Sequence, residues 1–185
     1  NTSHMKLISK FIYFIFGWEA VGDVPDGISK AVLIIAPHTS NLDFYIGTLY
    51  TWIRGIPGNV LVKKEAFKWP LVGIIKKLGG IPIDRSKSNS KVAQIVNMFS
   101  EREILFLAIT PEGTRKRNDN WKMGFYHIAV KANVPILLCY IDYKLKRAGI
   151  GEPFWPTGNM EEDFKKIEDF YRGRNAKHPE FFNLN

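Results

Sequence analysis

A histidine and an aspartate are spaced so that one could orient the other for proton transfer. They are His38 and Asp43, in the run Pro37-His38-Thr39-Ser40-Asn41-Leu42-Asp43. On one continuous helix, five residues rotate by about 500°, which leaves the two side chains roughly 140° apart. They meet if His38 stands on a turn and a helix begins within residues 39–41, which are good N-cap types. Nδ1 of His38 would then face Asp43, and Nε2 could take a proton from a hydroxyl.

Two later segments carry groups suited to an anionic ligand. Asp84 and Arg85 follow the apolar residues 81–83, and the guanidinium of Arg85 can fork onto a phosphate or carboxylate. The run Thr110-Pro111-Glu112-Gly113-Thr114-Arg115 combines a stiff turn, a glycine that admits close approach, and two donors. A basic cluster continues from it, formed by Arg115, Lys116, Arg117 and Lys122.

Each feature has a plainer interpretation when it is taken alone. The histidine and aspartate could form a polar turn that caps a helix, Asp84 and Arg85 a surface ion pair, and residues 110–115 a solvated loop. Together, a histidine–aspartate base and two arginine-bearing turns suit a substrate with a hydroxyl and a phosphate. The reaction would be transfer of a group to that hydroxyl.

Alternating elements must position these motifs. Apolar runs of strand length are found at residues 31–36, 59–62, 81–83, 104–109 and 134–141. Helical patterns lie between and after them, at residues 43–53, 69–78, 88–102, 123–132 and 161–171. This alternation predicts a single-domain α/β layered fold, with a central, largely parallel or mixed sheet covered by helices. Each motif follows a predicted strand, where ligands gather in such sheets.

Size and composition agree with one globular domain. The chain has 185 residues, 45% of them hydrophobic and 24% charged, which excludes disordered and collagen-like classes. Lys and Arg number 26 against 18 acidic residues, and the net charge of +8 favours an anionic partner. Cys139 is the single cysteine, so there is no intrachain disulfide and no cysteine-based zinc site. His38 and Asp43 lack a clear third metal ligand, so we expect no metal.

The first residues differ in character from the rest of the chain. Residues 1–4 resemble an expression scar before Met5, so we expect residues 5–185 to form the domain. Residues 6–18 predict a short amphipathic helix that either packs on the domain or lies in a lipid interface. No run of about 18 apolar residues is present to span a bilayer.

Four ordered blocks resemble those of the glycerolipid acyltransferases, the family typified by 1-acylglycerol-3-phosphate acyltransferase. They are a His-x4-Asp motif at 37–43, a Gly-x4-Asp-Arg motif at 79–85, a Pro-Glu-Gly-Thr-Arg motif within 110–115 and a proline-bearing apolar strand at 134–136. The likeness covers roughly residues 17–141. Pro37 and Thr110 depart from the usual residues of the first and third blocks, which suggests a divergent branch.

The resemblance implies the glycerol-3-phosphate acyltransferase-like fold and O-acyl transfer without a covalent acyl-enzyme. His38 would be the general base and Asp43 would orient it. The substrate-binding residues would be Asp84, Arg85, Glu112, Gly113, Thr114, Arg115 and Lys122. The donor would be acyl-CoA or acyl carrier protein, and the acceptor a lysophospholipid. No cofactor is implied, and the enzyme would be peripheral at the cytoplasmic face of the membrane.

Alternatives stay open at this point. The acceptor could be a lyso-aminolipid, or the chain could be a non-catalytic relative that binds a lipid or anion. A nucleic-acid binder would account for the charge, but the basic cluster is local and no nucleic-acid-binding module is evident. The glycine-rich motifs of nucleotide-binding proteins do not occur in the sequence.

Overall fold

A single sheet forms the centre of the molecule. The computed structural model describes residues 2–84 and 91–184. The strands are β1 (Glu19–Val21), β2 (Lys30–Ile35), β3 (Gly58–Lys63), β4 (Gly80–Ile83), β5 (Leu105–Ile109), β6 (Ile136–Asp142) and β7 (Arg147–Phe154). Their order in the sheet is β1-β7-β6-β2-β5-β3-β4, and every neighbouring pair is parallel except β6 and β7. The predicted α/β fold with a largely parallel sheet is confirmed.

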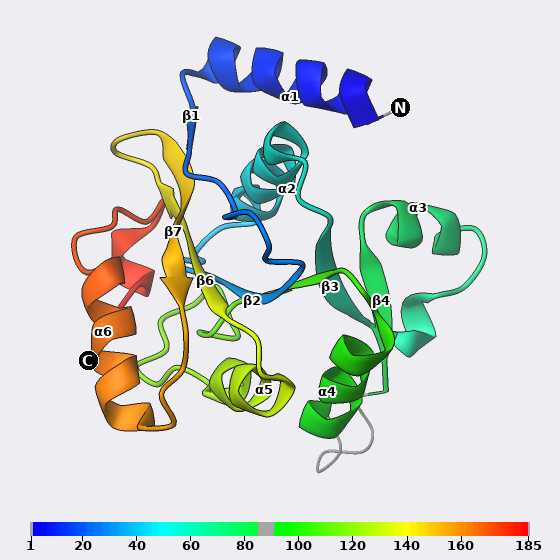
Figure 1. Cartoon of the computed structure of the whole chain (residues 1–185). Coiled ribbons are helices and arrows are strands. Elements are labelled where there is room, and N and C mark those ends of the chain that lie inside the picture. The colour runs from blue at the N-terminus through cyan, green and yellow to red at the C-terminus, as the bar shows by residue number, and fades with distance from the viewer. Residues whose placement is uncertain (1, 85–90, 185) are drawn as a thin grey trace.

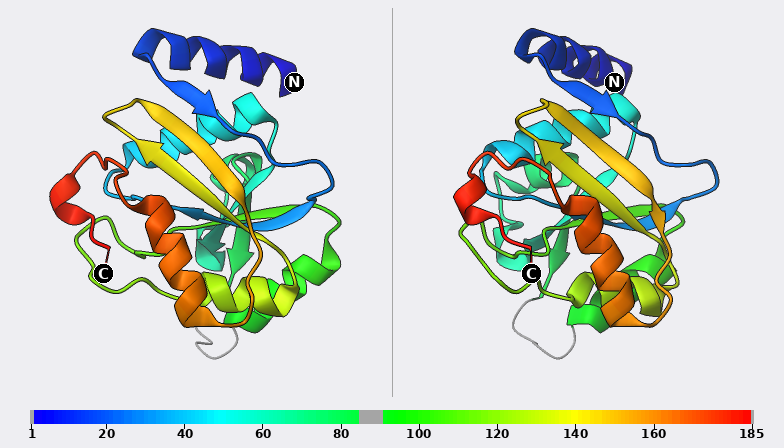
Figure 2. Two further views of the ribbon diagram at one scale, coloured as in Figure 1. Left: turned by 60° about the vertical axis from the view of Figure 1, so that its left-hand side comes forward. Right: turned by 90° about the vertical axis from the view of Figure 1, so that its left-hand side faces the viewer.

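Helices cover both faces of this sheet (Figures 1 and 2). They are α1 (Thr2–Phe16), α2 (Leu42–Arg54), α3 (Val72–Lys77), α4 (Lys91–Glu101), α5 (Gly124–Ala132) and α6 (Met160–Tyr171), with short 3-10 turns at Lys64–Ala66 and Pro179–Phe181. Core residues of α4, α5 and α6 share one face, whereas α2 covers the other and α1 packs outside α2.

Strand β2 lies in the middle of the sheet and serves both cores. Val32 and Ile34 belong to the cluster that faces α4, α5 and α6, whereas Ala31 and Leu33 belong to the cluster beneath α2. All four are at most 3% exposed, as expected for a parallel strand with helices on both faces. Because this strand is held on both faces, the loop that follows it starts from a fixed position.

Two strands were not predicted from the sequence, β1 and β7. Strand β7 contains Gly149 and Gly151, which break the usual apolar pattern of a strand. A Cβ at Gly149 would lie 2.7 Å from the Tyr140 ring, and one at Gly151 would lie 2.4 Å from the Phe170 ring. The glycines are therefore needed because aromatic rings lie directly on the strand.

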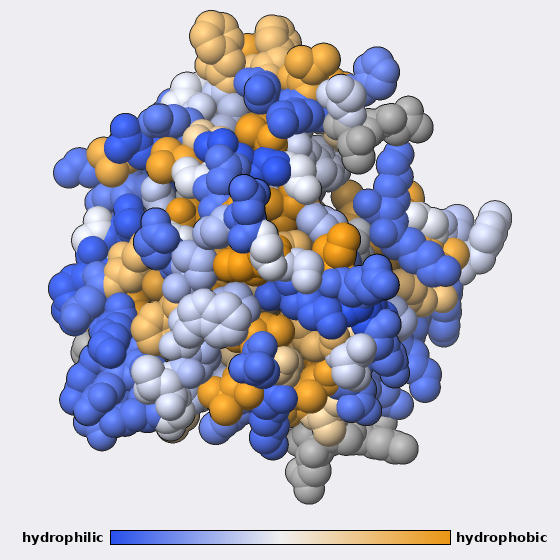
Figure 3. Space-filling view, in the orientation of Figure 1, coloured by the Kyte–Doolittle hydropathy of each residue, from blue (hydrophilic) through white to orange (hydrophobic). Residues whose placement is uncertain are grey.

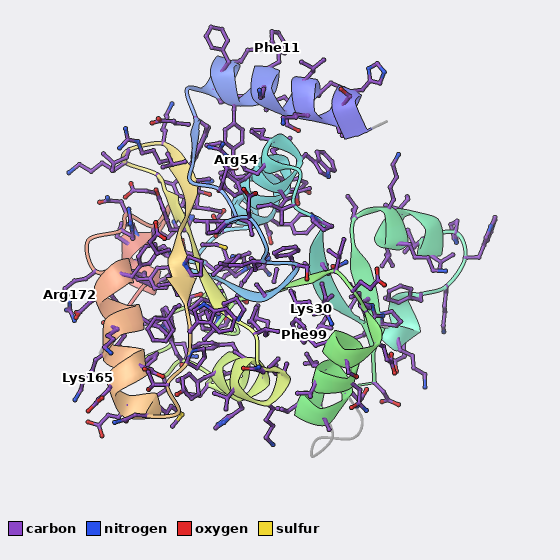
Figure 4. The ribbon with its side chains drawn as sticks, in the orientation of Figure 1. Phe11, Lys30, Arg54, Phe99, Lys165 and Arg172 are labelled. Carbon is purple, nitrogen blue, oxygen red and sulfur yellow. The ribbon has the colours of Figure 1, made fainter. Side chains whose placement is uncertain are left out.

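Within residues 2–84 and 91–184, the helices are all too short or too polar to cross a bilayer. Helix α1 is nevertheless amphipathic. Ser9 and Tyr13 are buried, and the Tyr13 hydroxyl donates to the carbonyl of Ile46 in α2 at 2.8 Å. The opposite side of α1 is apolar and exposed, and Phe11 points away from the domain (Figure 4).

Candidate active site

The polar motifs gather at one edge of the sheet. Strands β2, β3, β4, β5 and β6 all run in the same direction, so their carboxyl ends share this edge. The loop after β2 carries His38, the loop after β5 carries Glu112, and β6 is followed directly by Tyr143. Ligands of open α/β sheets bind at this edge.

His38 and Asp43 meet across the start of α2. Nδ1 of His38 lies 3.1 Å from Oδ2 of Asp43, and the two side chains are 19% and 1% exposed. The predicted geometry is confirmed, since His38 precedes the helix and Asp43 lies in its first turn. The capping differs in detail from the expectation: Asn41 makes no side-chain cap, and Ser40 Oγ instead accepts from the Leu42 N–H at 3.2 Å.

The Asp43 carboxylate accepts hydrogen bonds at both oxygens. Oδ2 accepts from the N–H groups of Thr39 and Ser40, both at 2.9 Å, in addition to its contact with His38. Oδ1 accepts from the Tyr143 hydroxyl at 2.5 Å. Burial alone would raise the pKa of Asp43, but the hydrogen bonds from His38, Tyr143 and Ser40 outweigh it, and the pKa is lowered. Asp43 is therefore ionised at neutral pH and holds the loop around itself.

Tyr143 is a site residue that the motif analysis missed. It is 100 positions from Asp43 in sequence and just beyond the four matched blocks. Its N–H donates to the carbonyl of Asn175 at 2.8 Å, and its ring meets the Trp18 ring edge-on at 5.3 Å. Burial and the bond to Asp43 raise the pKa of Tyr143, so its hydroxyl stays protonated as a donor. Its place two residues after the predicted strand 134–141 was the signal that could have identified it.

Glu112 is hydrogen-bonded to the backbone of the His38 loop. Its Oε1 accepts from the backbone N–H of His38 at 2.9 Å, and the side chain is only 4% exposed. In the part of the chain that the structure describes, its buried Oε2 has no hydrogen-bond partner. Burial raises the pKa of Glu112 to about 7. Its observed contact is thus to the protein backbone, and the implied contact with a substrate stays a prediction.

The variant Glu112→Gln should make folding stability less dependent on pH. Burial raises the pKa of Glu112 from 4.5 to about 7, so the folded protein binds more protons than the unfolded chain between these values. Wild-type stability therefore falls as pH rises through this window. The glutamine variant lacks this titration, so its unfolding free energy relative to wild type should rise by about 3 kcal/mol from pH 4.5 to 7.

Urea denaturation at a series of pH values measures this difference. Glu103→Gln, at an exposed position, controls for the loss of one surface carboxylate. A constant difference between Glu112→Gln and wild type over the whole window would contradict the buried titration.

The rest of the third motif is open to solvent. Gly113, Thr114, Arg115 and Lys122 are all exposed, in the loop between β5 and α5. Gly113 has φ +67°, and a Cβ there would lie 2.7 Å from Nζ of Lys122, so the lysine lies over the glycine. This loop offers cationic and hydroxyl groups at the same edge as His38.

Asp84 follows β4 at the same edge but farther along it. Strand β4 is three positions from β2, which places Asp84 about 14 Å along the edge from the His38 loop. Its carboxylate is 3.5 Å from Nζ of Lys64, which follows β3. Arg85, its predicted partner in phosphate binding, lies outside the described residues.

An apolar cavity of about 1020 Å³ extends from this site beneath α2. Asp43 and Phe44 line it, as do Leu33, Ala108 and Ile150 of the sheet. Cys139 also lines it, and burial raises the pKa of this thiol to about 12, which disfavours a thiolate nucleophile. No group of three or more possible metal ligands gathers among residues 2–84 and 91–184.

The site can therefore supply three kinds of chemistry. Asp43 can stabilise positive charge on His38, whose Nε2 has no partner among the described residues. The exposed loop can bind an anion, and the cavity can take a long apolar group.

Known proteins share the sequence pattern. The family described as Acyltransferase matches residues 20–142. A 1-acyl-sn-glycerol-3-phosphate acyltransferase of Limnanthes douglasii is 28% identical over 138 residues, which cover 71% of this chain and 48% of the relative. The enzyme of that name in Salmonella typhimurium is 35% identical over 113 residues, which cover 57% of this chain and 44% of the relative. The chain spans about half the length of the curated relatives it matches.

The fold has a solved counterpart. The crystal structure of the 1-acyl-sn-glycerophosphate (LPA) acyltransferase PlsC from Thermotoga maritima aligns with a TM-score of 0.64. The alignment covers 95% of this chain and 81% of that chain at 19% identity, so it shows a common fold. Since the family pattern spans well over half of the sequence and includes His38, Asp43 and Glu112 at the sheet edge, the chain belongs to the acyltransferase family.

Proposed function

We propose that this chain is an O-acyltransferase that moves a fatty acyl group from a thioester to the free hydroxyl of a lysophospholipid such as 1-acylglycerol-3-phosphate. The observation that carries the proposal is the contact of His38 Nδ1 with the buried Asp43 carboxylate at the carboxyl edge of the sheet. Both curated relatives described above are named for this acceptor, which supports the choice.

In the proposed reaction, His38 donates its Nδ1 proton to Asp43 in a hydrogen bond, which leaves Nε2 as the base. Nε2 takes the proton of the acceptor hydroxyl while that oxygen attacks the thioester carbonyl carbon. The tetrahedral intermediate collapses with loss of the carbon–sulfur bond, and the departing thiolate receives the proton from the imidazolium. The ionised Asp43 stabilises the imidazolium between these steps. The products are an ester and a free thiol, and no acyl-enzyme forms.

The acceptor phosphate would be held by the exposed loop after β5. Arg115 provides a planar fork of donors for phosphate oxygens, and Thr114 and Lys122 can add a hydroxyl and an ammonium. Arg85 and Asp84, which follow β4 farther along the same edge, would complete the phosphate site. The donor would be acyl-CoA or acyl carrier protein, and the reaction uses side chains and two substrates without a cofactor.

The fatty chain would lie in the cavity under α2. Its volume of about 1020 Å³ is at the upper end of ligand pockets, and its walls are mostly apolar. Asp43 lines the cavity, so an acyl chain within it would place its carbonyl end near the His38–Asp43 pair.

We further propose peripheral attachment to the cytoplasmic face of a membrane through α1. Leu7, Phe11 and Phe14 are 64%, 63% and 81% exposed on the side that faces away from the domain. Lys6 and Lys10 flank this apolar face. Aromatic residues and lysines on one amphipathic helix suit the interface between lipid head groups and acyl chains. Figure 3 shows the apolar side chains of α1 at the top of the molecule.

The proposal is tested by release of free thiol from palmitoyl-CoA and palmitoyl acyl carrier protein. The acceptors are lysophosphatidate, monoacylglycerol and a lyso-aminolipid. Turnover is expected with lysophosphatidate, and Arg115→Ala should raise its KM roughly tenfold or more while leaving the KM for monoacylglycerol unchanged.

Arg117→Ala is the matched control, because Arg117 is on the same loop but pairs with Asp119 at 3.0 Å. Equal weakening toward charged and neutral acceptors would contradict the phosphate role of Arg115. Vesicle binding without turnover for any pair of substrates would instead indicate a non-catalytic lipid-binding relative.

A further inference from the structure

The segment around α3 exposes an unusual apolar stripe. Trp69 is 89% exposed, and Leu71, Ile74 and Leu78 are 56%, 59% and 36% exposed. The last three are spaced by three and four residues, so they follow one side of the helix. A surface helix of a globular protein normally turns its polar side outward, as α6 does with Glu161 and Lys165. We call this region the α3 surface. It consists of Trp69, Leu71, Ile74 and Leu78 together with the lysines at positions 76 and 77.

Lysines surround this stripe. Residues 64–78 contain four lysines, at positions 64, 68, 76 and 77, against one acid, Glu65. All four lysines are exposed. Lys64 is 3.5 Å from Asp84, and the other three form no ion pair within the described part of the chain. Tryptophan, aliphatic side chains and lysines together are typical of segments at the interface of an anionic bilayer.

The α3 surface borders the same cavity as α1. Ile74, Lys76, Lys77 and Leu78 line the cavity, as do Ser3, Met5 and Lys6 of α1. Both helices are at the end of the molecule away from α5 and α6 (Figure 1). Figure 3 shows apolar side chains over α1 at the top, and apolar and polar side chains together over the α3 region at the right. Two segments with apolar and basic character therefore stand on two sides of one cavity.

We propose that the α3 surface is a second lipid contact, which seats the protein on a bilayer that contains anionic phospholipid. This inference rests on the proposed peripheral attachment and deepens it. Contacts through both α1 and the α3 surface would place the cavity, which both segments line, next to the lipid. An acidic carrier protein would match the lysines, but it would leave the larger apolar face of α1 uncovered. A bilayer with anionic phospholipid matches both the apolar side chains and the lysines of the two segments.

Sedimentation with vesicles of phosphatidylcholine, with and without phosphatidylglycerol, tests the proposal on the whole chain. Lys76→Gln/Lys77→Gln should weaken binding to the anionic vesicles by roughly 30-fold, since each lysine near such a surface is worth about fivefold. The same variant should bind vesicles of pure phosphatidylcholine as wild type does. Trp69→Ser/Leu71→Ser should weaken binding to both kinds of vesicle.

Matched variants on distant elements control for exposure and net charge. Trp155→Ser removes a tryptophan that is 56% exposed, and Lys131→Gln/Lys166→Gln removes two exposed lysines from α5 and α6. Both should bind vesicles like wild type, and thermal melts should show that all variants are folded. A loss as large in these controls as in the α3 variants would overturn the proposal.

The remaining outcomes separate this inference from the proposed function. If wild type binds no vesicles, peripheral attachment fails together with the second contact. If wild type binds and the α3 variants bind equally well, only the α3 surface is refuted. It is also refuted if those variants keep vesicle binding but lose turnover with acyl carrier protein alone, or if they convert a dimer to a monomer. Weaker vesicle binding in Trp69→Ser/Leu71→Ser with intact thiol release from soluble substrates supports it, because neither of these residues lines the cavity.

Discussion

His38→Ala should lower kcat by roughly 10³-fold with both thioester donors, because a positioned general base contributes about 10²–10⁴ to such transfers. The fold should survive the change. Alanine keeps the backbone N–H that donates to Glu112, and the only hydrogen bond of the His38 side chain among the described residues is to Asp43. KM for the acceptor should change little, since the imidazole acts on the proton and does not bind the phosphate. Thiol release at saturating substrate measures the effect.

His127→Ala is the matched control, because this histidine is exposed on α5 and belongs to none of the predicted motifs. It should leave kcat unchanged. Full activity in His38→Ala, with a normal thermal melt, would refute the assignment of His38 as the base and leave the acyl transfer itself to be explained by another group.

Asp43→Asn should lower kcat by a similar factor, about 10²–10⁴, for a different reason. The asparagine oxygen can still accept from His38, but it carries no charge to stabilise the imidazolium. The variant should also lose about 1–3 kcal/mol of stability, because Asp43 is buried and its two oxygens accept from His38, Thr39, Ser40 and Tyr143. Kinetics and urea denaturation measure the two effects separately.

Asp142→Asn separates catalysis from stability. Asp142 is 1% exposed and accepts hydrogen bonds from Asn175 and from the backbone at residues 144 and 145, so its loss should destabilise the fold while kcat stays near wild type. The double variant of His38 and Asp43 should be no slower than His38→Ala, since the two side chains act as one unit. Independent, multiplying effects would contradict a shared role.

Local patterns predicted the framework because each predicted strand or helix is encoded by consecutive residues. The run 31–36 is apolar on both faces and became the central strand β2, and the turn at His38 follows from its end. Strand β7 escaped prediction because its glycines are explained only by Tyr140 and Phe170, which approach from other elements. Periodicity along the chain carries no information about such neighbours.

The site was predictable in part for the same reason. His38 and Asp43 are five residues apart, so helix geometry alone sets the condition under which they meet. Tyr143 reaches Asp43 only because β6 lies beside β2, and Glu112 reaches the His38 backbone only because β5 lies on the other side. Sheet order, which single-residue patterns do not encode, determines both contacts.

Segment 172–184 makes several contacts whose consequence concerns the timing of biosynthesis. Asn175 binds the Tyr143 backbone, the N–H of His178 donates to Thr39 Oγ1 at 3.2 Å, and Asn183 donates to Asp119 at 2.9 Å. During synthesis, the strands of the sheet and the loops after β2 and β5 leave the ribosome before this segment does. In the nascent polypeptide, the His38 loop and Tyr143 would therefore lack these contacts. The contacts would form only after the segment has been synthesised and packs against them.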